Sequence, residues 1–259
     1  MPEDLLRYAV SDGVAVLTLD NPPLNLVTLE LTRRLGEVLG RLAADPATRV
    51  LVVTGAGSRA FCAGSDVNEF PAVGDDVVPR KLARENEVYS RLDDFPRPTI
   101  AALNGLAYGG GLELAACCDL VVAGTDVRLA LPEIKLGVFP GTGGTVRVAR
   151  RVGEGRAKEL MFLGDPIDAE TARAWGLVNR LVPPGQALAA ALDLARVLAG
   201  RPRRALELCK AAIDLGLDLP EDEALRRTLA LSEAVFRTDE CREGVRAFLA
   251  KEPPRFRPS

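Results

Sequence analysis

The chain has 259 residues, of which 47% are hydrophobic and 27% are charged, the composition of an ordinary soluble globular protein. It contains no histidine, which excludes a Ser-His-Asp triad and a His-ligated metal site, so we expect no metal. The formal net charge of −3 argues against nucleic acid as a partner. If this is an acid–base enzyme, carboxylates are the expected catalytic groups, because histidine, the commonest one, is missing.

The cysteines and the N-terminus favour a cytoplasmic protein. The five cysteines form an odd set, and Cys117 and Cys118 are adjacent, so we expect reduced and mostly buried thiols. The first residues lack the basic-then-apolar order of a signal peptide, and no apolar run approaches the ~20 residues that span a bilayer. We therefore expect neither export nor a membrane partner.

Residues 1–140 alternate predicted strands and helices. The turn pair Asp12-Gly13 precedes an apolar run, Val14–Leu19, which predicts a hairpin. Apolar residues recur at helical spacing behind Thr28 and predict an amphipathic helix over 28–44. Buried strands are expected at residues 50–54, 99–103 and 120–123. This alternation indicates an α/β fold.

The second half of the chain is predicted to be helical. Asp168 is placed to cap a helix over 169–175, and Gly176 is placed to end it. After a short segment at 177–181, helical spacing covers residues 185–200, 203–216, 221–236 and 239–250. The sequence contains no low-complexity linker and no exact internal repeat.

Three consecutive glycines, Gly109 to Gly111, follow an expected strand and precede an apolar stretch of helical composition. Such a segment can bend the chain sharply and leave the first N–H groups of a helix without intrahelical partners, where they can bind an anion. The same glycines could instead form only a flexible turn. A second glycine turn, at Phe61–Asp66, could add another N–H group at the same point.

Two glutamates follow these backbone features. Glu113 lies in an otherwise apolar run, residues 112–118, so its carboxylate is expected to be buried and to need a purpose or a partner. Most single glutamates on helices are solvent-exposed instead. Glu133 follows Pro132 and could take part in catalysis, or could simply open a helical turn, where an acidic residue is favoured. The local sequence leaves both interpretations of each glutamate open.

One competing motif begins at Gly55. The segment Gly55–Ala60 has the G-x-G-x-x-A spacing of a dinucleotide site, and an aspartate pair follows ~20 residues later. A dinucleotide fold needs a helix that continues from residue 58, but Gly64 and Pro71 would break such a helix within about two turns. We therefore expect no nicotinamide cofactor.

Three segments resemble the enoyl-CoA hydratase/isomerase family, also called the crotonase superfamily. They are Arg59–Asp66 (RAFCAGSD), Asn104–Ala115 (NGLAYGGGLELA) and Pro132–Thr145 (PEIKLGVFPGTGGT). Two later segments, 172–179 and 243–248, are also similar, so the resemblance covers essentially the whole chain. It implies an α/β fold in which residues 1–185 form a crotonase-like spiral of ββα turns with the active site. Residues 186–259 would form a helical region that trimerises, often into a homohexamer.

The resemblance also implies a substrate and catalytic groups. Substrates of the family are acyl-CoA thioesters, so coenzyme A is part of the substrate and no separate cofactor is expected. By position, the N–H groups of Ser65 and Gly110 would form an oxyanion hole for the thioester carbonyl. Glu113 would activate water, and Glu133 would exchange the proton at the α-carbon.

Glu133 would need a raised pKa to act as an acid at neutral pH. The second carboxylate and three apolar neighbours are suited to raise it, namely Leu131, Ile134 and Leu136.

Further positions resemble the substrate-binding residues of the family. They come from an early loop near the nucleotide end of CoA, from the turn around Ser65, and from a C-terminal helix that reaches a neighbouring subunit's CoA in some members. These residues are Asn25, Leu26, Ala63, Asp66, Val67, Asn68, Phe248 and Lys251. Two positions depart from the family. Ser65 stands where many hydratases have alanine, which could alter acyl preference, and Val67-Asn68 stand where a basic residue often lies near the phosphates.

Retention of both glutamates favours an enoyl-CoA hydratase, which adds water across the 2,3 double bond through an enolate. An enoyl-CoA isomerase on the same scaffold is the alternative, since it can function with a single acid at the position of Glu133. Family branches with a catalytic histidine are excluded. The family also includes an RNA-binding relative, but the acidic chain and both glutamates weigh against that function. Residues 71–92 are expected to cover the acyl end of the substrate, whose identity within fatty acid metabolism stays open.

Overall fold

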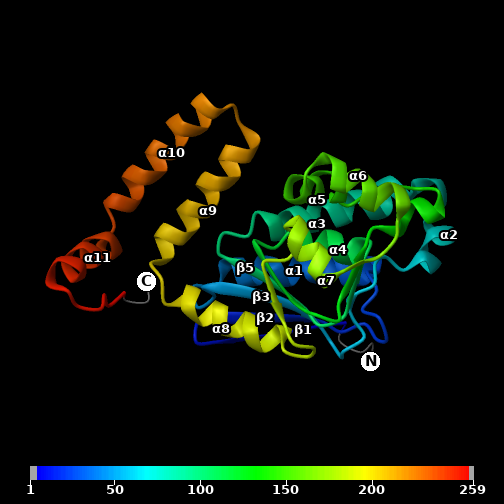
Figure 1. Cartoon of the computed structure of the whole chain (residues 1–259), viewed down its shortest axis with the longest axis horizontal. Helices are drawn as coiled ribbons and strands as arrows, with labels where there is room; N and C mark the ends of the chain where they lie inside the picture. The colour runs from blue at the N-terminus through cyan, green and yellow to red at the C-terminus, as the bar shows by residue number, and fades with distance from the viewer. Residues whose placement is uncertain (1–4, 257–259) are drawn as a thin grey trace.

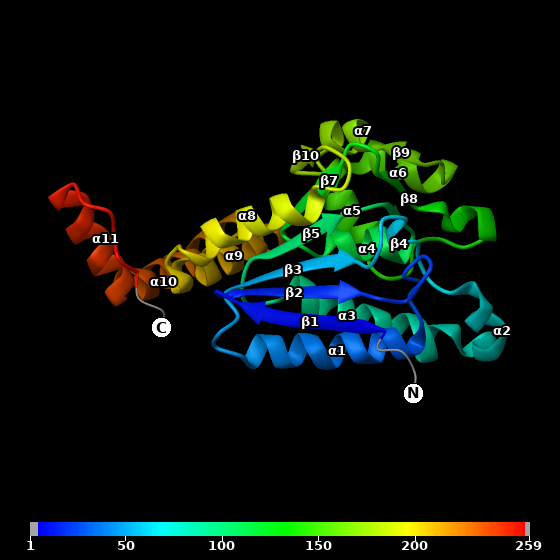
Figure 2. The ribbon, with the colours of Figure 1, turned by 90° about the horizontal axis from the view of Figure 1, so that it is seen from below.

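The computed structural model describes residues 5–256, which contain two sheets surrounded by helices (Figures 1 and 2). The larger sheet has the strand order β1 (Leu6–Ser11), β2 (Val14–Leu19), β3 (Val50–Gly55), β5 (Thr99–Leu103), β7 (Leu120–Gly124) and β10 (Arg180–Val182). The smaller sheet has the order β4 (Ala60–Cys62), β6 (Leu106–Tyr108), β8 (Arg128–Ala130) and β9 (Ile167–Asp168). Neighbouring strands are parallel except at β1 with β2 and β8 with β9.

The chain repeats one pattern, in which a strand of the larger sheet is followed by a strand of the smaller sheet and then by a helix. The first repeat is β3, β4 and a helical segment that ends in α3 (Ala83–Asp93), and the second is β5, β6 and α4 (Gly110–Ala116). In the third, β7 and β8 are followed by η4 (Pro132–Leu136) and α5 (Gly144–Val152). Because equivalent strands pair in parallel, the chain winds as a spiral, and the predicted α/β spiral of ββα turns is confirmed.

The N-terminal hairpin and first helix lie where the sequence predicts them. Asp12 and Gly13 have φ angles of 52° and 81°, the left-handed backbone that a two-residue hairpin turn requires. Helix α1 (Leu29–Ala44) begins after Thr28, whose side-chain oxygen accepts the N–H of Leu31. The apolar face of α1 is buried in the main core between the sheets and helices.

Between β4 and α3, the chain forms four short helical pieces. They are η1 (Val67–Glu69), α2 (Phe70–Val73), η2 (Gly74–Asp76) and η3, a π-helix (Val78–Leu82). We call residues 67–82 the cover segment. Strand β4 starts at Ala60, so the helix that a dinucleotide fold needs after residue 58 is not formed.

Helices α5 and α6 (Glu154–Leu163) were not predicted. Each is short and starts behind a glycine with positive φ, Gly143 at 101° and Gly153 at 82°, so their apolar spacing is interrupted in the sequence. Helix α7 (Ala169–Trp175) has the predicted ends. The Asp168 side chain accepts the N–H of Thr171, and Gly176 ends the helix in the left-handed conformation.

The C-terminal helices divide into one that packs on the sheet and three that project from it (Figures 1 and 2). Helix α8 (Ala187–Ala199) buries Ala191 and Ala195 against Val52, Ile100 and Val122 of the larger sheet. The projecting arm consists of α9 (Arg203–Asp218), α10 (Glu221–Phe236) and α11 (Asp239–Ala250), close to the predicted ranges. A division of the chain at residue 185 stays a prediction.

The described residues include no helix with the length and apolar character needed to cross a bilayer. All five cysteines are free thiols, and three of them, Cys62, Cys117 and Cys118, are buried as predicted.

Candidate active site

Glu113 lies on α4, a helix whose residues are all buried, and is 3% exposed. Its Oε1 accepts the backbone N–H groups of Thr142 and Gly144, each at 2.8 Å, and its Oε2 accepts the Thr142 hydroxyl. Gly144 begins α5, so the carboxylate lies at a helix N-terminus, where negative charge is favoured. Burial raises the pKa of Glu113, and these hydrogen bonds oppose the rise. The prediction of a buried, partnered carboxylate is confirmed.

Glu133 has a different environment. It lies in η4, and its Oε2 is buried without a hydrogen-bond partner in the described part of the chain. Burial raises the pKa of Glu133 to about 7, and the negative charge of Glu113 adds to the rise. The two carboxyl groups therefore differ in hydrogen bonding. Both oxygens of Glu113 accept hydrogen bonds, whereas Oε2 of Glu133 has no partner in the described part of the chain.

The predicted source of the Glu133 shift is only partly right. Leu131 is fully buried, but Ile134 and Leu136 are 44% and 62% exposed, so they point to solvent and do not shield the carboxyl group. Successive residues of the tight turn in η4 face different directions, which a count of apolar neighbours in the sequence cannot detect. The backbone of Gly109 lies beside the carboxyl group instead, and a Cβ there would be 2.9 Å from Oε1 of Glu133.

The three consecutive glycines have three different environments. Gly109 has a φ of 50° and lies against Glu133. A Cβ at Gly111 would lie 2.0 Å from the carbonyl oxygen of Cys62, so only glycine fits there. A Cβ at Gly110 would meet nothing closer than the Tyr89 hydroxyl at 3.5 Å, an ordinary contact distance. The protein itself therefore gives no steric reason for glycine at position 110.

Two backbone N–H groups meet at the start of α4. Gly110 is the first residue of that helix, so its N–H has no intrahelical acceptor. Val27 donates to the Gly64 carbonyl and accepts the Asp66 N–H, so the N–H of Ser65 points away from Val27.

The N–H groups of Ser65 and Gly110 lie close together. A Cβ at Gly64 would lie 3.7 Å from the Gly110 nitrogen, and a Cβ at Gly110 would lie 3.7 Å from the Ser65 nitrogen. Neither N–H donates to an acceptor within residues 5–256. Two neighbouring N–H groups without acceptors are what an oxyanion hole requires.

Tyr89 supports the start of α4, although no pattern in the sequence pointed to this role. Its side chain is 1% exposed on α3, and its hydroxyl donates to the Gly110 carbonyl oxygen at 2.9 Å. Tyr89 thus fixes the first peptide of α4. Thr142 and Gly144, the donors to Glu113, lie inside the segment Pro132–Thr145, but no spacing rule connects them with a residue 29 or more positions earlier.

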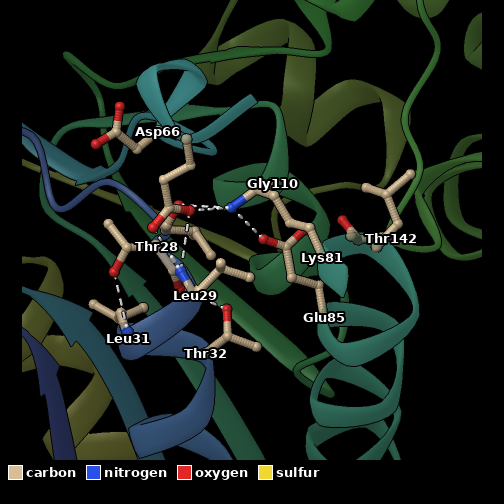
Figure 3. A network of polar contacts seen from close by, with 12 residues as sticks. Thr28, Leu29, Leu31, Thr32, Asp66, Lys81, Glu85, Gly110 and Thr142 are labelled. Carbon is tan, nitrogen blue, oxygen red and sulfur yellow. Dashed lines mark hydrogen bonds and ion pairs between the residues drawn. The ribbon is translucent and has the colours of Figure 1, made fainter. Parts of the chain in front are cut away.

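A buried ion-pair network connects the cover segment to the core (Figure 3). Lys81 is fully buried, and its Nζ lies 2.8 Å from Oε2 of Glu69 and 3.0 Å from Oε1 of Glu85. Glu69 in turn accepts the N–H of Leu29 at the start of α1. The only sequence signal is the i,i+4 spacing of Lys81 and Glu85, which is common on exposed helices.

The enoyl-CoA hydratase/isomerase family model matches residues 9–258. This chain belongs to the enoyl-CoA hydratase/isomerase family. It is 35% identical over 240 residues to a short-chain-enoyl-CoA hydratase from Clostridium acetobutylicum, covering 92% of each protein. It is 37% identical over 245 residues to 2,3-dehydroadipyl-CoA hydratase from Escherichia coli, covering 94% of this chain and 95% of the relative. A crystal structure of an enoyl-CoA hydratase from Bacillus anthracis superimposes with a TM-score of 0.94 at 32% identity, over 99% of this chain and all of the other.

The remaining positions matched to the family lie in three places. Asn25 is buried, and its Nδ2 donates to the carbonyl oxygens of Ala56 and Ala60, so this side chain shapes its loop. Leu26 beside it is half-buried. Around Ser65, Asp66 accepts the N–H and side-chain amide of Asn68. Ala63 is half-buried, while Val67 and Asn68 are exposed.

Phe248 and Lys251 lie at the far end of the arm from α4 (Figure 2). Phe248 is 82% exposed. Within one chain these two residues are therefore not part of the site, and a contact with a neighbouring subunit's ligand stays a prediction. Within residues 5–256, no three histidine, cysteine, aspartate or glutamate side chains gather as metal ligands would.

Proposed function

We propose that this protein is an enoyl-CoA hydratase, which adds water across the 2,3 double bond of a 2-enoyl-CoA thioester. The observation that carries the proposal is the unequal pair of carboxyl groups beside two converging N–H donors. Glu113 accepts hydrogen bonds from Thr142 and Gly144, whereas burial raises the pKa of Glu133 to about 7. A carboxyl group that holds its proton near neutral pH and a carboxylate whose oxygens accept three hydrogen bonds are suited to act as acid and base in one reaction.

The reaction begins with the thioester oxygen bound by the N–H groups of Ser65 and Gly110. These donors withdraw electron density, so the β-carbon becomes electrophilic and the developing enolate is stabilised. Glu113 takes one proton from water as the water oxygen bonds to the β-carbon. Protonated Glu133 then gives its proton to the α-carbon, and the enolate collapses to the 3-hydroxyacyl thioester. Water has supplied one O–H group and Glu133 one proton.

The active pair carries a single proton. Before hydration the proton lies on Glu133, and after hydration the proton from water lies on Glu113. A proton must then return to Glu133 before the next turnover. Dehydration uses the same singly protonated pair in reverse, because hydration releases and consumes no net proton.

The thioester part of the proposal is supported by the family and by the two named relatives, both of which are hydratases of CoA thioesters. Those relatives are named for different acyl groups, although their sequence identities to this chain are similar. Sequence identity alone therefore does not indicate which acyl group this protein accepts. Coenzyme A would enter as part of the substrate. We assign the acyl end to residues 71–92, which follow Ser65 in the chain and run from α2 into α3.

A panel of 2-enoyl-CoA thioesters tests the function, with loss of the conjugated-thioester absorbance as the readout. We expect hydration of at least one member and formation of a 3-hydroxyacyl-CoA. A protein that hydrates none of them but converts a 3-enoyl-CoA to the 2-enoyl isomer would be an isomerase instead. RNA retained in a filter-binding assay would favour the non-catalytic alternative.

We also infer a homotrimer or a homohexamer. The arm presents large apolar side chains that a single chain leaves exposed, among them Ile213, Leu217, Leu225, Leu229, Phe236, Phe248 and Leu249. Apolar faces of this extent are typical of protein interfaces. In such an assembly Phe248 and Lys251 would reach the CoA of a neighbouring subunit. Light scattering at micromolar concentration tests this, and a monomer would contradict it. The free thiols support a cytoplasmic location.

A further inference from the structure

The hydroxyl oxygen and the backbone nitrogen of Ser65 both lie close to Gly110. A Cβ at Gly110 would be 3.6 Å from Oγ of Ser65 and 3.7 Å from its nitrogen. The hydroxyl and the two N–H donors therefore lie around one point at the start of α4. Ser65 is half-buried, which leaves its hydroxyl within reach of a molecule bound at that point.

Other hydroxyl groups nearby are already engaged. Tyr89 donates to the Gly110 carbonyl oxygen, and Thr142 donates to Glu113. The Ser65 hydroxyl, in contrast, has no hydrogen-bond partner among the residues that the structure describes. A serine hydroxyl rotates freely about its Cβ–Oγ bond, so it can turn its proton toward an acceptor without moving the backbone.

We propose that the Ser65 hydroxyl is a third donor of the oxyanion hole, acting beside the N–H groups of Ser65 and Gly110. The inference rests on the proposed function, because it needs a thioester oxygen that becomes negatively charged. A hydrogen bond to a charged oxygen is about twice as strong as one to a neutral oxygen. The hydroxyl thus stabilises the enolate more than the bound thioester, and an interaction of that kind raises kcat rather than lowering KM.

The residue type matters for this proposal because alanine at position 65 would keep the backbone donor and lose only the hydroxyl. Ser65→Ala is therefore a clean test. We expect kcat for the best 2-enoyl-CoA substrate to fall about tenfold, the effect of one charge-assisted hydrogen bond, while KM changes less than about twofold. Ser11→Ala is the matched control, because Ser11 is exposed on β1 and its hydroxyl donates to the neighbouring Asp12.

Binding measurements separate the hydroxyl from general damage to the site. Acetoacetyl-CoA, a 3-ketoacyl thioester that can bind as its enolate, and butyryl-CoA, a saturated thioester, are titrated against both proteins. Ser65→Ala should weaken the enolate about tenfold and leave butyryl-CoA binding unchanged. Wild-type kcat in Ser65→Ala, or an equal loss of affinity for both thioesters, would overturn the proposal.

Failure of the proposed function gives a different result. If the wild-type protein hydrates no 2-enoyl-CoA, the hydratase proposal falls. The affinity difference between the two thioesters then still decides whether the Ser65 hydroxyl donates to an enolate oxygen.

Discussion

Glu133 lies directly against the backbone of Gly109, where a Cβ atom would be 2.9 Å from Oε1 of the glutamate. The N–H of Gly109 also donates to the Ala130 carbonyl oxygen, in the strand that leads to Glu133. The next residue, Gly110, supplies an N–H group to the candidate oxyanion hole. One short bend therefore places the proposed acid close to the proposed carbonyl-binding group, although the two lie far apart in the sequence.

Gly110→Ala should reduce turnover at least about a hundredfold with only a small loss of stability. The protein has room for the methyl group, since its nearest neighbour would be 3.5 Å away, but the added Cβ occupies space beside the N–H that we propose binds the thioester oxygen. Steady-state kinetics and thermal unfolding check the two halves of this expectation.

Gly111→Ala is the matched control for that variant. Its Cβ would lie 2.0 Å from the Cys62 carbonyl oxygen, a backbone atom, so we expect a loss of stability of about 3 kcal/mol. Near-normal turnover in folded Gly110→Ala would mean that the glycine triplet is only a structural turn.

Glu113→Gln and Glu133→Gln should each leave a folded protein that binds CoA thioesters but hydrates them at least about a hundredfold more slowly. In Glu113→Gln, the introduced amide can keep the bonds with Thr142 and Gly144, because the Thr142 hydroxyl can change from donor to acceptor. Rates with a 2-enoyl-CoA are compared with those for a 3-enoyl-CoA. Full hydration by Glu113→Gln would refute the two-carboxylate mechanism, and retained double-bond migration alone would favour an isomerase.

Hydration and dehydration should lose activity together as the pH rises through about 7. The singly protonated pair acts in both directions, and its proton is lost near the pKa of Glu133, which is about 7. Above that pH, kcat/KM should fall about tenfold per pH unit in each direction. Initial rates measured with the enoyl and the 3-hydroxyacyl thioester test this. A hydration rate that stays level up to about pH 9 would show that Glu133 is not the acid.

The stability of Glu133→Gln relative to the wild type should increase as the pH rises. The folded-state pKa of Glu133 is about 7 and lies above the ordinary value of 4.5, so the folded state holds this proton more tightly than the unfolded state does. The stabilisation that the folded state gains from binding this proton is complete below about pH 4.5 and is lost as the pH rises through 7. Urea unfolding at about pH 5 and about pH 8 measures this, and the free energy of unfolding of the variant minus that of the wild type should be larger at the higher pH. Parallel pH profiles would contradict the raised pKa.

The fold was largely predictable because its signals are local. The Asp12-Gly13 turn, the Thr28 and Asp168 caps and the apolar spacing of the arm helices each act over a few residues. Helices α5 and α6 were missed because glycines at their starts interrupt the pattern that marks longer helices.

The candidate site was predictable only in part. Glu113 stands out because a carboxylate in an apolar helix has to have a partner, but the sequence does not name Thr142 as that partner. Tyr89 and Lys81 carry no local signal, since an aromatic residue and a Lys-x-x-x-Glu pair on a helix are ordinary. The surroundings of Glu133 were only partly predicted, because Ile134 and Leu136 are exposed and the backbone of Gly109, which lies beside the carboxyl group, is distant in sequence and makes no hydrophobic pattern.

Lys81→Met should destabilise the protein by about 3–5 kcal/mol, because it leaves the carboxylate of Glu85 buried without its partner. The loss should be larger at about pH 8 than at about pH 5, since unpaired Glu85 can take up a proton in the folded state as the pH falls. Urea unfolding at both pH values measures it.

Arg91→Met is the matched control for Lys81→Met, because Arg91 also pairs with a glutamate four positions away on α3, but at an exposed site. We expect it to cost less than about 1 kcal/mol. The double variant Lys81→Met with Glu85→Leu should recover much of the loss, since it removes both buried charges together. Equal effects of Lys81→Met and Arg91→Met would mean that the buried pair contributes no more than a surface pair, and the cover segment would then depend on its apolar contacts alone.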